Sequence, residues 1–255
     1  GYLALAANTT ADDNTAVGAY ALRCNTEGTE VTAFGCGALK ANTTGDHSTA
    51  LGAASLLNNT TGTCNTAVGI IALCNNTTGF SNTGVGALAL RVVSTGDCNV
   101  GVGYNAGNST TTGDNNTSLG YDAQPSSNSV AHEFTLGNGA HNNLRCADTS
   151  ISSLSDERDK ENIEDIPLGL EYILALRPIK FDWNRRDGSS KGKKDYGFIA
   201  QELDKVEEKF GLKEYTRLVS KENPEKWEAD PMKTYPILIK AIQELKKEID
   251  ELKKK

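Results

Sequence analysis

A 17-residue repeat constrains the fold of this chain more than any other feature of its sequence. Two glycine columns keep this step, Gly1, Gly18, Gly35, Gly52, Gly69, Gly86, Gly103 and Gly120, and Gly28, Gly45, Gly62, Gly79, Gly96 and Gly113. The residue before each glycine of the first column is apolar from Val17 onwards, and a leucine column runs in register from Leu5 to Leu90. Such a short period predicts a β-solenoid, in which each turn adds one apolar rung to a continuous core.

The residues between the apolar columns are suited to tight corners. Glycine accepts a positive φ without steric cost, and asparagine tolerates it next best. Asn-x-Ser/Thr triplets occur at Asn8, Asn42, Asn58, Asn59, Asn76, Asn108 and Asn116. They are acceptors for N-glycosylation by sequence, but most fall in the corner register, which favours turn chemistry as their origin. The core columns are mostly alanine, valine and leucine, so we expect a thin coil that gains much when three copies pack together.

Charge divides the chain near residue 150. Residues 1–150 hold four basic and ten acidic residues, a net charge of −6, whereas residues 151–255 hold 22 basic and 23 acidic ones, a net charge of −1. We therefore expect repeats over 1–123, a neck or cap over 124–150 where the period breaks, and a different domain over 151–255. Neither half is basic enough to predict a nucleic-acid partner.

Several other functional classes find no support in the sequence. No apolar run approaches the roughly 20 residues that span a bilayer, so we expect no membrane insertion. The six cysteines form no CxxC pair and histidine occurs three times, so we expect no metal site and no cofactor. Because the chain begins within the repeat pattern, we expect the natural protein to continue upstream of Gly1.

The last hundred residues read as a small α+β domain. The pattern predicts a helix over 168–176, a strand over 179–183, a strand from Tyr196 that turns into a helix to about Phe210, a strand over 217–219 and a second hairpin near Trp227. From Met232 to the end we expect one helix. Its heptad seam, Leu238, Ile242, Leu245, Ile249 and Leu252, favours self-association as a coiled coil over a lone amphipathic helix.

Motif phrases in both segments carry family resemblances. Asn-Thr-Ala-Val-Gly-x-x-Ala-Leu with Asn-Thr-Thr-Gly resembles the head repeats of trimeric autotransporter adhesins, which implies a trimeric left-handed β-roll over about 1–123. The triple β-helix of phage fibre shafts is the competing architecture. Four ordered phrases, at 154–163, 177–183, 196–202 and 236–245, resemble the endosialidase-type C-terminal intramolecular chaperone, a self-cleaving peptidase family of phage and viral tail spikes and fibres.

The second resemblance implies a homotrimer that templates folding of the upstream fibre and then cuts itself off. Carried over to this chain, the scissile bond is Leu154–Ser155, with Ser155 as nucleophile and Lys160 as its base. Asp156 and Arg158 match motif positions to which we assign an orienting role. The alternative interpretation makes Ser155 a helix N-cap.

The implied chemistry places demands on the surroundings of Lys160. A serine hydroxyl needs a base, and lysine serves as one only when its pKa falls from about 10.4 towards neutrality, through burial or nearby positive charge. We therefore expect cleavage only after assembly removes water. Residues five apart lie about 140° apart on a helix, so either the stretch is not helical at Ser155 or Lys160 acts from a neighbouring chain.

These observations predict the C-terminal part of a trimeric fibre or spike with a self-cleaving chaperone, assembled in the host cytoplasm and carried on the virion. The upstream fibre is expected to bind a host-surface receptor, either glycan or protein. A non-enzymatic trimeric adhesin or stalk at a cell surface, with a permanent trimerisation domain, is the alternative. A conventional hydrolase and a membrane-released transcription factor are disfavoured, because the sequence offers neither a converging catalytic set nor a spanning helix and basic region.

Overall fold

The computed structural model describes residues 1–140, 155–186, 191–211, 213–221, 223, 225 and 227–254. The chain divides into two compact units, Gly1–His141 and Asn142–Lys255. We call the described parts of these units, 1–140 and 155–254, the repeat unit and the C-terminal unit. The neck or cap expected over 124–150 lies partly outside the described residues.

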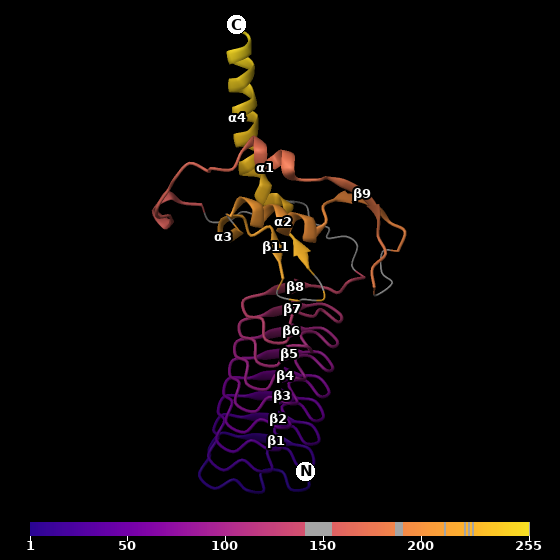
Figure 1. Cartoon of the computed structure of the whole chain (residues 1–255). Helices are drawn as coiled ribbons and strands as arrows, with labels where there is room; N and C mark the ends of the chain where they lie inside the picture. Colours follow the sequence, from indigo (N-terminus) through magenta and orange to yellow (C-terminus); the bar gives the residue numbers. More distant parts are fainter. Residues whose placement is uncertain are drawn as a thin grey trace, which may run out of the picture. The chain divides into compact units, whose positions relative to one another are not determined.

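The repeat unit is a β-solenoid with the predicted 17-residue step. Its short strands are β1 (Thr15–Val17), β2 (Thr32–Phe34), β3 (Thr49–Leu51), β4 (Thr66–Val68), β5 (Thr83–Val85), β6 (Val100–Val102), β7 (Thr117–Leu119) and β8 (Phe134–Leu136). They pair in parallel and in chain order, and each strand residue faces the residue 17 positions further on, as Thr15 faces Thr32. The strands stack as successive rungs (Figure 1).

The core of the repeat unit is a column of leucines and small residues. Leu22, Leu39, Leu56, Leu73 and Leu90 are fully or almost fully buried, together with the middle strand residues Ala33, Ala50 and Ala67. The leucines have positive φ angles of 48–50°, a conformation that costs a non-glycine residue roughly 1–2 kcal/mol. Burial of a leucine side chain contributes about 1.5–3 kcal/mol, which offsets that strain.

The second apolar column differs from the expectation of a core column. Val17, Phe34 and Leu51 are the third residues of their strands and are about half exposed, whereas the middle residues point inwards. Successive side chains of a strand point to opposite faces, so the first and third residues of each strand necessarily lie on the outside.

Buried asparagines link successive rungs. Asn42 donates to Asn25 Oδ1 at 2.7 Å, Asn59 to Asn42 at 2.8 Å and Asn76 to Asn59 at 2.7 Å. A second column joins Asn65, Asn82, Asn99 and Asn116 in the same way through backbone and side-chain amides. The side chains of Asn42, Asn59, Asn76 and Asn116 are buried. The N-glycosylation triplets that begin at these four asparagines are therefore built into the fold, which favours turn chemistry as their origin.

The glycine columns mark close approaches between rungs. A Cβ on Gly45 would lie 2.4 Å from the carbonyl oxygen of Gly62, and a Cβ on Gly52, at φ 141°, would lie 2.5 Å from that of Gly69. Backbone atoms that near cannot yield to a side chain, so the glycine period follows from the stacking itself.

The C-terminal unit is small and mixed. Its elements are η1 (Glu157–Asp159), α1 (Leu170–Ala175), β9 (Ile179–Asp182), β10 (Lys194–Gly197), α2 (Ala200–Phe210), α3 (Lys213–Thr216), β11 (Val219–Ser220), β12 (Glu228–Ala229), η2 (Pro231–Thr234) and α4 (Tyr235–Leu252). β9 pairs antiparallel with β10, and β11 with β12. Leu168, Tyr172, Leu203, Leu218, Val219 and Ile237 form its core. The helix predicted over 168–176 is shorter in the structure, where α1 ends at Ala175. Arg177 precedes Pro178, and the residue before a proline disfavours helical geometry.

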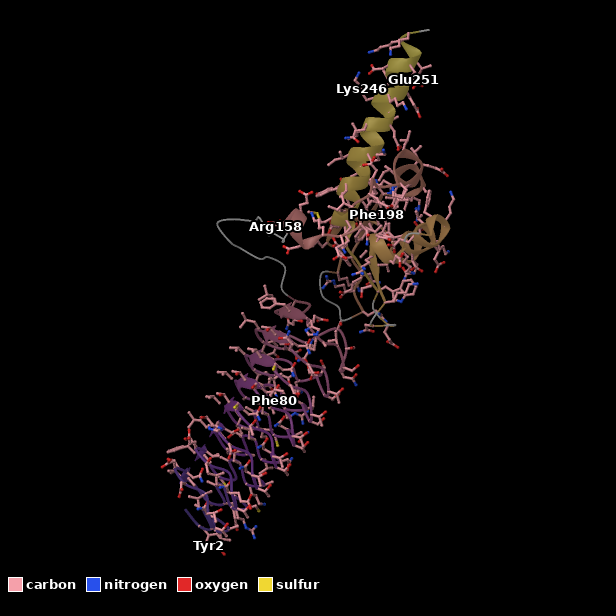
Figure 2. The ribbon with its side chains drawn as sticks, turned by 90° about the vertical axis from the view of Figure 1, so that its left-hand side faces the viewer. Tyr2, Phe80, Arg158, Phe198, Lys246 and Glu251 are labelled. Carbon is pink, nitrogen blue, oxygen red and sulfur yellow. The ribbon has the colours of Figure 1, made fainter. Side chains whose placement is uncertain are left out.

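The helix α4 packs on its own unit through one face only. Ile237 and Ala241 are buried, whereas the predicted seam residues Leu238, Ile242, Leu245, Ile249 and Leu252 are exposed. The C-terminal half of α4, marked by Lys246 and Glu251 in Figure 2, projects beyond the other elements of the unit. Among the described residues, no helix combines the length and apolar character that a membrane span requires.

Candidate active site

The candidate site is built on the single 3₁₀ turn η1. Asp156 is the N-cap of this turn, and its Oδ1 accepts a hydrogen bond from the Arg158 backbone amide at 2.9 Å. Aspartate is among the best N-cap residues, because its carboxylate satisfies an otherwise free amide. Ser155 therefore lies one residue before the cap, and the cap role that the alternative interpretation gave to Ser155 belongs to Asp156.

Ser155 and Lys160 meet within one chain. Lys160 Nζ lies 2.8 Å from Ser155 Oγ and 3.1 Å from the Ser155 carbonyl oxygen. The turn between them is 3₁₀, and Lys160 as its C-cap has extended backbone angles, φ −125° and ψ 138°. This geometry folds the lysine back towards the serine, which a regular helix with the same spacing would not do. The stretch is therefore not a regular helix at Ser155, which is one of the two arrangements that the sequence left open.

Asp156 and Arg158 form a bidentate ion pair beside the two residues. Arg158 Nε donates to Asp156 Oδ1 at 2.9 Å, and Nη2 donates to Oδ2 at 2.6 Å. The hydrogen bonds from Arg158 lower the pKa of Asp156, and the same pair raises the pKa of Arg158. Both carboxylate oxygens of Asp156 are thus held by Arg158, which keeps this carboxylate in place as the cap of the turn.

The site is open to water. Ser155 and Lys160 are both exposed, and Arg158, which marks the turn in Figure 2, has a side chain that is 88% exposed. Lysine in water is an ammonium ion that donates hydrogen bonds and cannot take a proton from serine. Leu154, on the other side of the predicted scissile bond, lies outside the described residues. The geometry of a serine–lysine pair is therefore present without the dry surroundings that the chemistry needs.

Polar contacts in the C-terminal unit connect the other motif phrases. Arg177 donates to both carboxylate oxygens of Glu202, at 2.9 Å from Nε and 2.5 Å from Nη2, and thereby joins the second phrase to the third. Glu244, in the fourth phrase, accepts a hydrogen bond at 2.7 Å from the Leu170 amide at the start of α1. Gly169 is the N-cap of α1, and a Cβ there would lie 2.1 Å from the Glu244 carboxylate. These motif residues hold the unit together.

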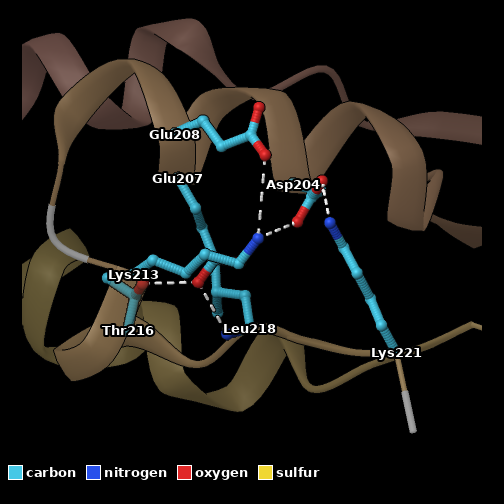
Figure 3. A network of polar contacts seen from close by, with 7 residues as sticks. All are labelled: Asp204, Glu207, Glu208, Lys213, Thr216, Leu218 and Lys221. Carbon is cyan, nitrogen blue, oxygen red and sulfur yellow. Dashed lines mark hydrogen bonds and ion pairs between the residues drawn. The ribbon is translucent and has the colours of Figure 1, made fainter.

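A buried network that the sequence did not predict stabilises α2 (Figure 3). Glu207 is almost fully buried, and its Oε1 accepts from Thr216 Oγ1 and, at 2.8 Å, from the Leu218 amide. Asp204 pairs with both Lys213 and Lys221. Burial, and then the nearby Glu207 charge, raise the pKa of Tyr172 to about 12. These contacts fix α2 against the segment that follows it.

The described residues contain no group of three or more His, Cys, Asp or Glu side chains that could hold a metal ion.

Comparison with known proteins identifies the segment that carries the site. A peptidase family model described as chaperone of endosialidase matches residues 155–212 and begins at Ser155. It contains the serine, the lysine and the Arg177–Glu202 pair. No curated protein and no solved structure matches the chain. Residues 155–212 thus match the chaperone-of-endosialidase family, and a β-solenoid precedes them in this chain.

Proposed function

We propose that this chain is the C-terminal part of a trimeric tail fibre or spike whose chaperone domain releases itself by cutting the Leu154–Ser155 bond. The observation that carries the proposal is the 2.8 Å contact between Ser155 Oγ and Lys160 Nζ, at the start of the segment that matches the family model. In this proposal the domain gathers three copies, sets the register of the upstream solenoid and is then removed. The fibre is assembled in the host cytoplasm, and its upstream part binds a glycan or protein receptor on the host surface.

The reaction is an acyl transfer followed by hydrolysis. Neutral Lys160 takes the proton of Ser155 Oγ, and the oxygen attacks the carbonyl carbon of Leu154. The C–N bond breaks, the proton on Lys160 passes to the Ser155 nitrogen, and the Leu154 acyl group is left as an ester on Ser155 Oγ. Water then hydrolyses this ester. The products are a Leu154 carboxylate and a Ser155 with a free amine and a free hydroxyl.

Assembly supplies the condition that the single chain lacks. Desolvation disfavours the charged form of lysine and lowers its pKa, so covering Lys160 converts an ammonium into a usable base. The heptad seam of α4 offers the means of assembly, since Leu238, Ile242 and Leu245 are exposed on a projecting helix. In this proposal, cleavage follows trimerisation because trimerisation excludes water from the serine–lysine pair.

A reason for such a domain lies in the repeat. A parallel solenoid of near-identical turns specifies its register between chains only weakly, because a one-rung slip costs little locally. Three C-termini held together fix the register before the coil forms. After the domain is released, the product need not refold, and its persistence becomes kinetic.

The exposed position of the serine and lysine is the one observation that favours the alternative, a non-enzymatic adhesin or stalk with a permanent C-terminal trimerisation domain. In that case the contact between Ser155 and Lys160 is an ordinary hydrogen bond at the surface, and the chain remains whole.

Cleavage of the full chain distinguishes the two functions. On denaturing gels we expect wild type to yield two fragments, and Ser155→Ala and Lys160→Met to remain intact. Two exposed residues of the same unit serve as matched controls, and Ser220→Ala and Lys193→Met should cleave like wild type. Cleavage of Ser155→Ala at the wild-type rate would rule out the proposed nucleophile.

A further inference from the structure

On the outer face of the solenoid sheet, the third residue of every strand is apolar, whereas the first residue is threonine in most strands. We call the outward-pointing first and third residues of β1 to β8 the strand face. Its large apolar side chains include Val17, Phe34, Leu51, Leu119, Phe134 and Leu136, which are 43–64% exposed. With strands about 4.8 Å apart, the eight strands present this face over roughly 34 Å. An exposed apolar column of this length, bordered by threonines, marks an interaction site.

The strand face also lacks charge, although the unit that carries it is acidic. The strands and the two residues that follow each of them hold no charged residue, over 15–19, 32–36, 49–53, 66–70, 83–87, 100–104, 117–121 and 134–138. Residues 1–140 nevertheless hold three basic and nine acidic residues, a net charge of −6, all of them elsewhere on the turns. The strand face is therefore the side on which two copies of this unit approach one another with the least charge repulsion.

We propose that the strand face is the surface through which copies of this chain contact one another, side by side, parallel and in register. A surface with one apolar side chain per 17-residue turn is matched along its whole length by another surface with the same step. A second solenoid of the same sequence supplies that step at every strand. Because the face is uncharged, like residues of two copies meet without repulsion.

The proposal explains why an apolar column that adds nothing to the core of one chain holds its period throughout the repeat unit. Val17, Phe34 and Leu51 lie outside the core that the leucines form, yet the same position stays apolar up to Leu136. In a single chain these side chains only expose apolar surface to water. Between copies they form a second core, parallel to the first.

This inference rests on the proposed function for the number of copies and for their register, but it concerns a different surface from α4 and from the serine–lysine pair. Cleavage at Ser155 and contact at the strand face are therefore measured separately on the same sample. Cleavage without contact at the strand face would refute this inference alone. Contact at the strand face without cleavage would refute only the proposed cleavage.

The test is thiol cross-linking in the full chain with all six cysteines replaced by serine. Leu51→Cys and Leu119→Cys place thiols on the strand face, where the native side chains are exposed and the substitution leaves the core intact. Asn58→Cys is the matched control, because Asn58 is also exposed but lies on the turn after β3, outside the strand face. The reagent is a short bismaleimide.

We expect each strand-face variant to give at least about tenfold more inter-chain product than Asn58→Cys, because neighbouring thiols have effective concentrations in the millimolar range. An equimolar mixture of Leu51→Cys and Leu119→Cys chains should give no mixed product. These positions lie four 17-residue repeats apart, which is roughly 19 Å along the sheet and beyond the reach of the reagent.

Three results would overturn the inference. The first is equal product from Asn58→Cys and the strand-face variants. The second is mixed product between positions 51 and 119, which shows that the copies are not in register. The third is the absence of inter-chain product from both strand-face variants, whether light scattering shows an oligomer, whose contacts then lie elsewhere, or a monomer.

Discussion

Removing one amide from the buried asparagine column should weaken the solenoid far more than removing its exposed neighbour. Asn59 donates from Nδ2 to Asn42 Oδ1 at 2.8 Å and to the Gly62 carbonyl at 2.9 Å, and its Oδ1 accepts from Asn76 at 2.7 Å. Asn58 is exposed and makes one long contact, 3.4 Å to Asn75. The substitutions Asn59→Ala and Asn58→Ala therefore compare a buried and an exposed amide at adjacent positions.

The magnitude follows from the number of bonds. Three hydrogen bonds at about 1 kcal/mol each, with the Asn42 oxygen and the Gly62 carbonyl left buried without that donor, give a loss of about 3–5 kcal/mol for Asn59→Ala. Asn58→Ala should stay within about 0.5 kcal/mol of the parent, as expected for a surface substitution.

Both variants are best measured in a Ser155→Ala background, which is expected to keep the chain in one piece. Guanidinium unfolding followed by circular dichroism gives the difference in free energy of unfolding. Hydrogen exchange shows whether the loss is confined to the rungs around residues 42–76. If Asn59→Ala and Asn58→Ala unfold at the same denaturant concentration, the asparagine column does not stabilise the fold.

Three further perturbations test other parts of the structure. Val93 occupies the next position of the asparagine column, and Asn76 Oδ1 beside it has no hydrogen-bond partner. Val93→Asn supplies a donor worth about 1–3 kcal/mol but loses a similar free energy of apolar burial. The free energy of unfolding in guanidinium should therefore change by less than about 1 kcal/mol. Burial raises the pKa of Asp204, but hydrogen bonds from two lysines outweigh this effect and lower the pKa overall. The ionised Asp204 therefore stabilises the fold above its unfolded pKa of about 3.9, and this stabilisation is lost as pH falls through the lower folded pKa. Asp204→Asn should remove this acid-dependent part of the free energy of unfolding. On the seam of α4, Ile242→Asp should reduce the mass measured by light scattering and slow cleavage, whereas the exposed control Lys247→Asp should change neither; a trimer that survives Ile242→Asp would exclude the seam as its basis.

The repeat could be predicted from the sequence because glycine and leucine each recur at a fixed step that the backbone requires. The period does not show whether the side chains of a column point into the core or outwards. Val17 and Leu22 both belong to apolar columns of step 17, yet one lies outside and the other inside. The difference depends on where the three-residue strand falls in the turn, with a small residue at its centre.

The C-terminal unit was less predictable, because its decisive contacts join residues far apart in the chain. The helix seam and the order of elements follow from local patterns. Glu207 gives no local sign that it is buried, since it is one of three glutamates on the charged helix α2. Glu244 meets the Leu170 amide across 74 positions, and no spacing rule anticipates such a contact.

At the candidate site, too, the sequence predicts the residues but not the contact between them. The sequence motif selects Ser155 and Lys160, but their spacing of five leaves open whether they meet within one chain or between chains. In the structure, the 3₁₀ turn capped by Asp156 and the extended backbone of Lys160 bring the two side chains together within one chain. The catalytic roles of the two residues stay predictions, as does the bond after Leu154.

The most direct test of the proposed function is the identity of the first residue of the released C-terminal fragment. The purified full chain is incubated at neutral pH, the fragments are separated, and the N-terminus of the smaller one is determined by Edman degradation or mass spectrometry. We predict a free amine on Ser155, with Leu154 as the last residue of the larger fragment. A chain that stays whole after days in its assembled form, or a fragment that begins at any other residue, would contradict the proposed cleavage.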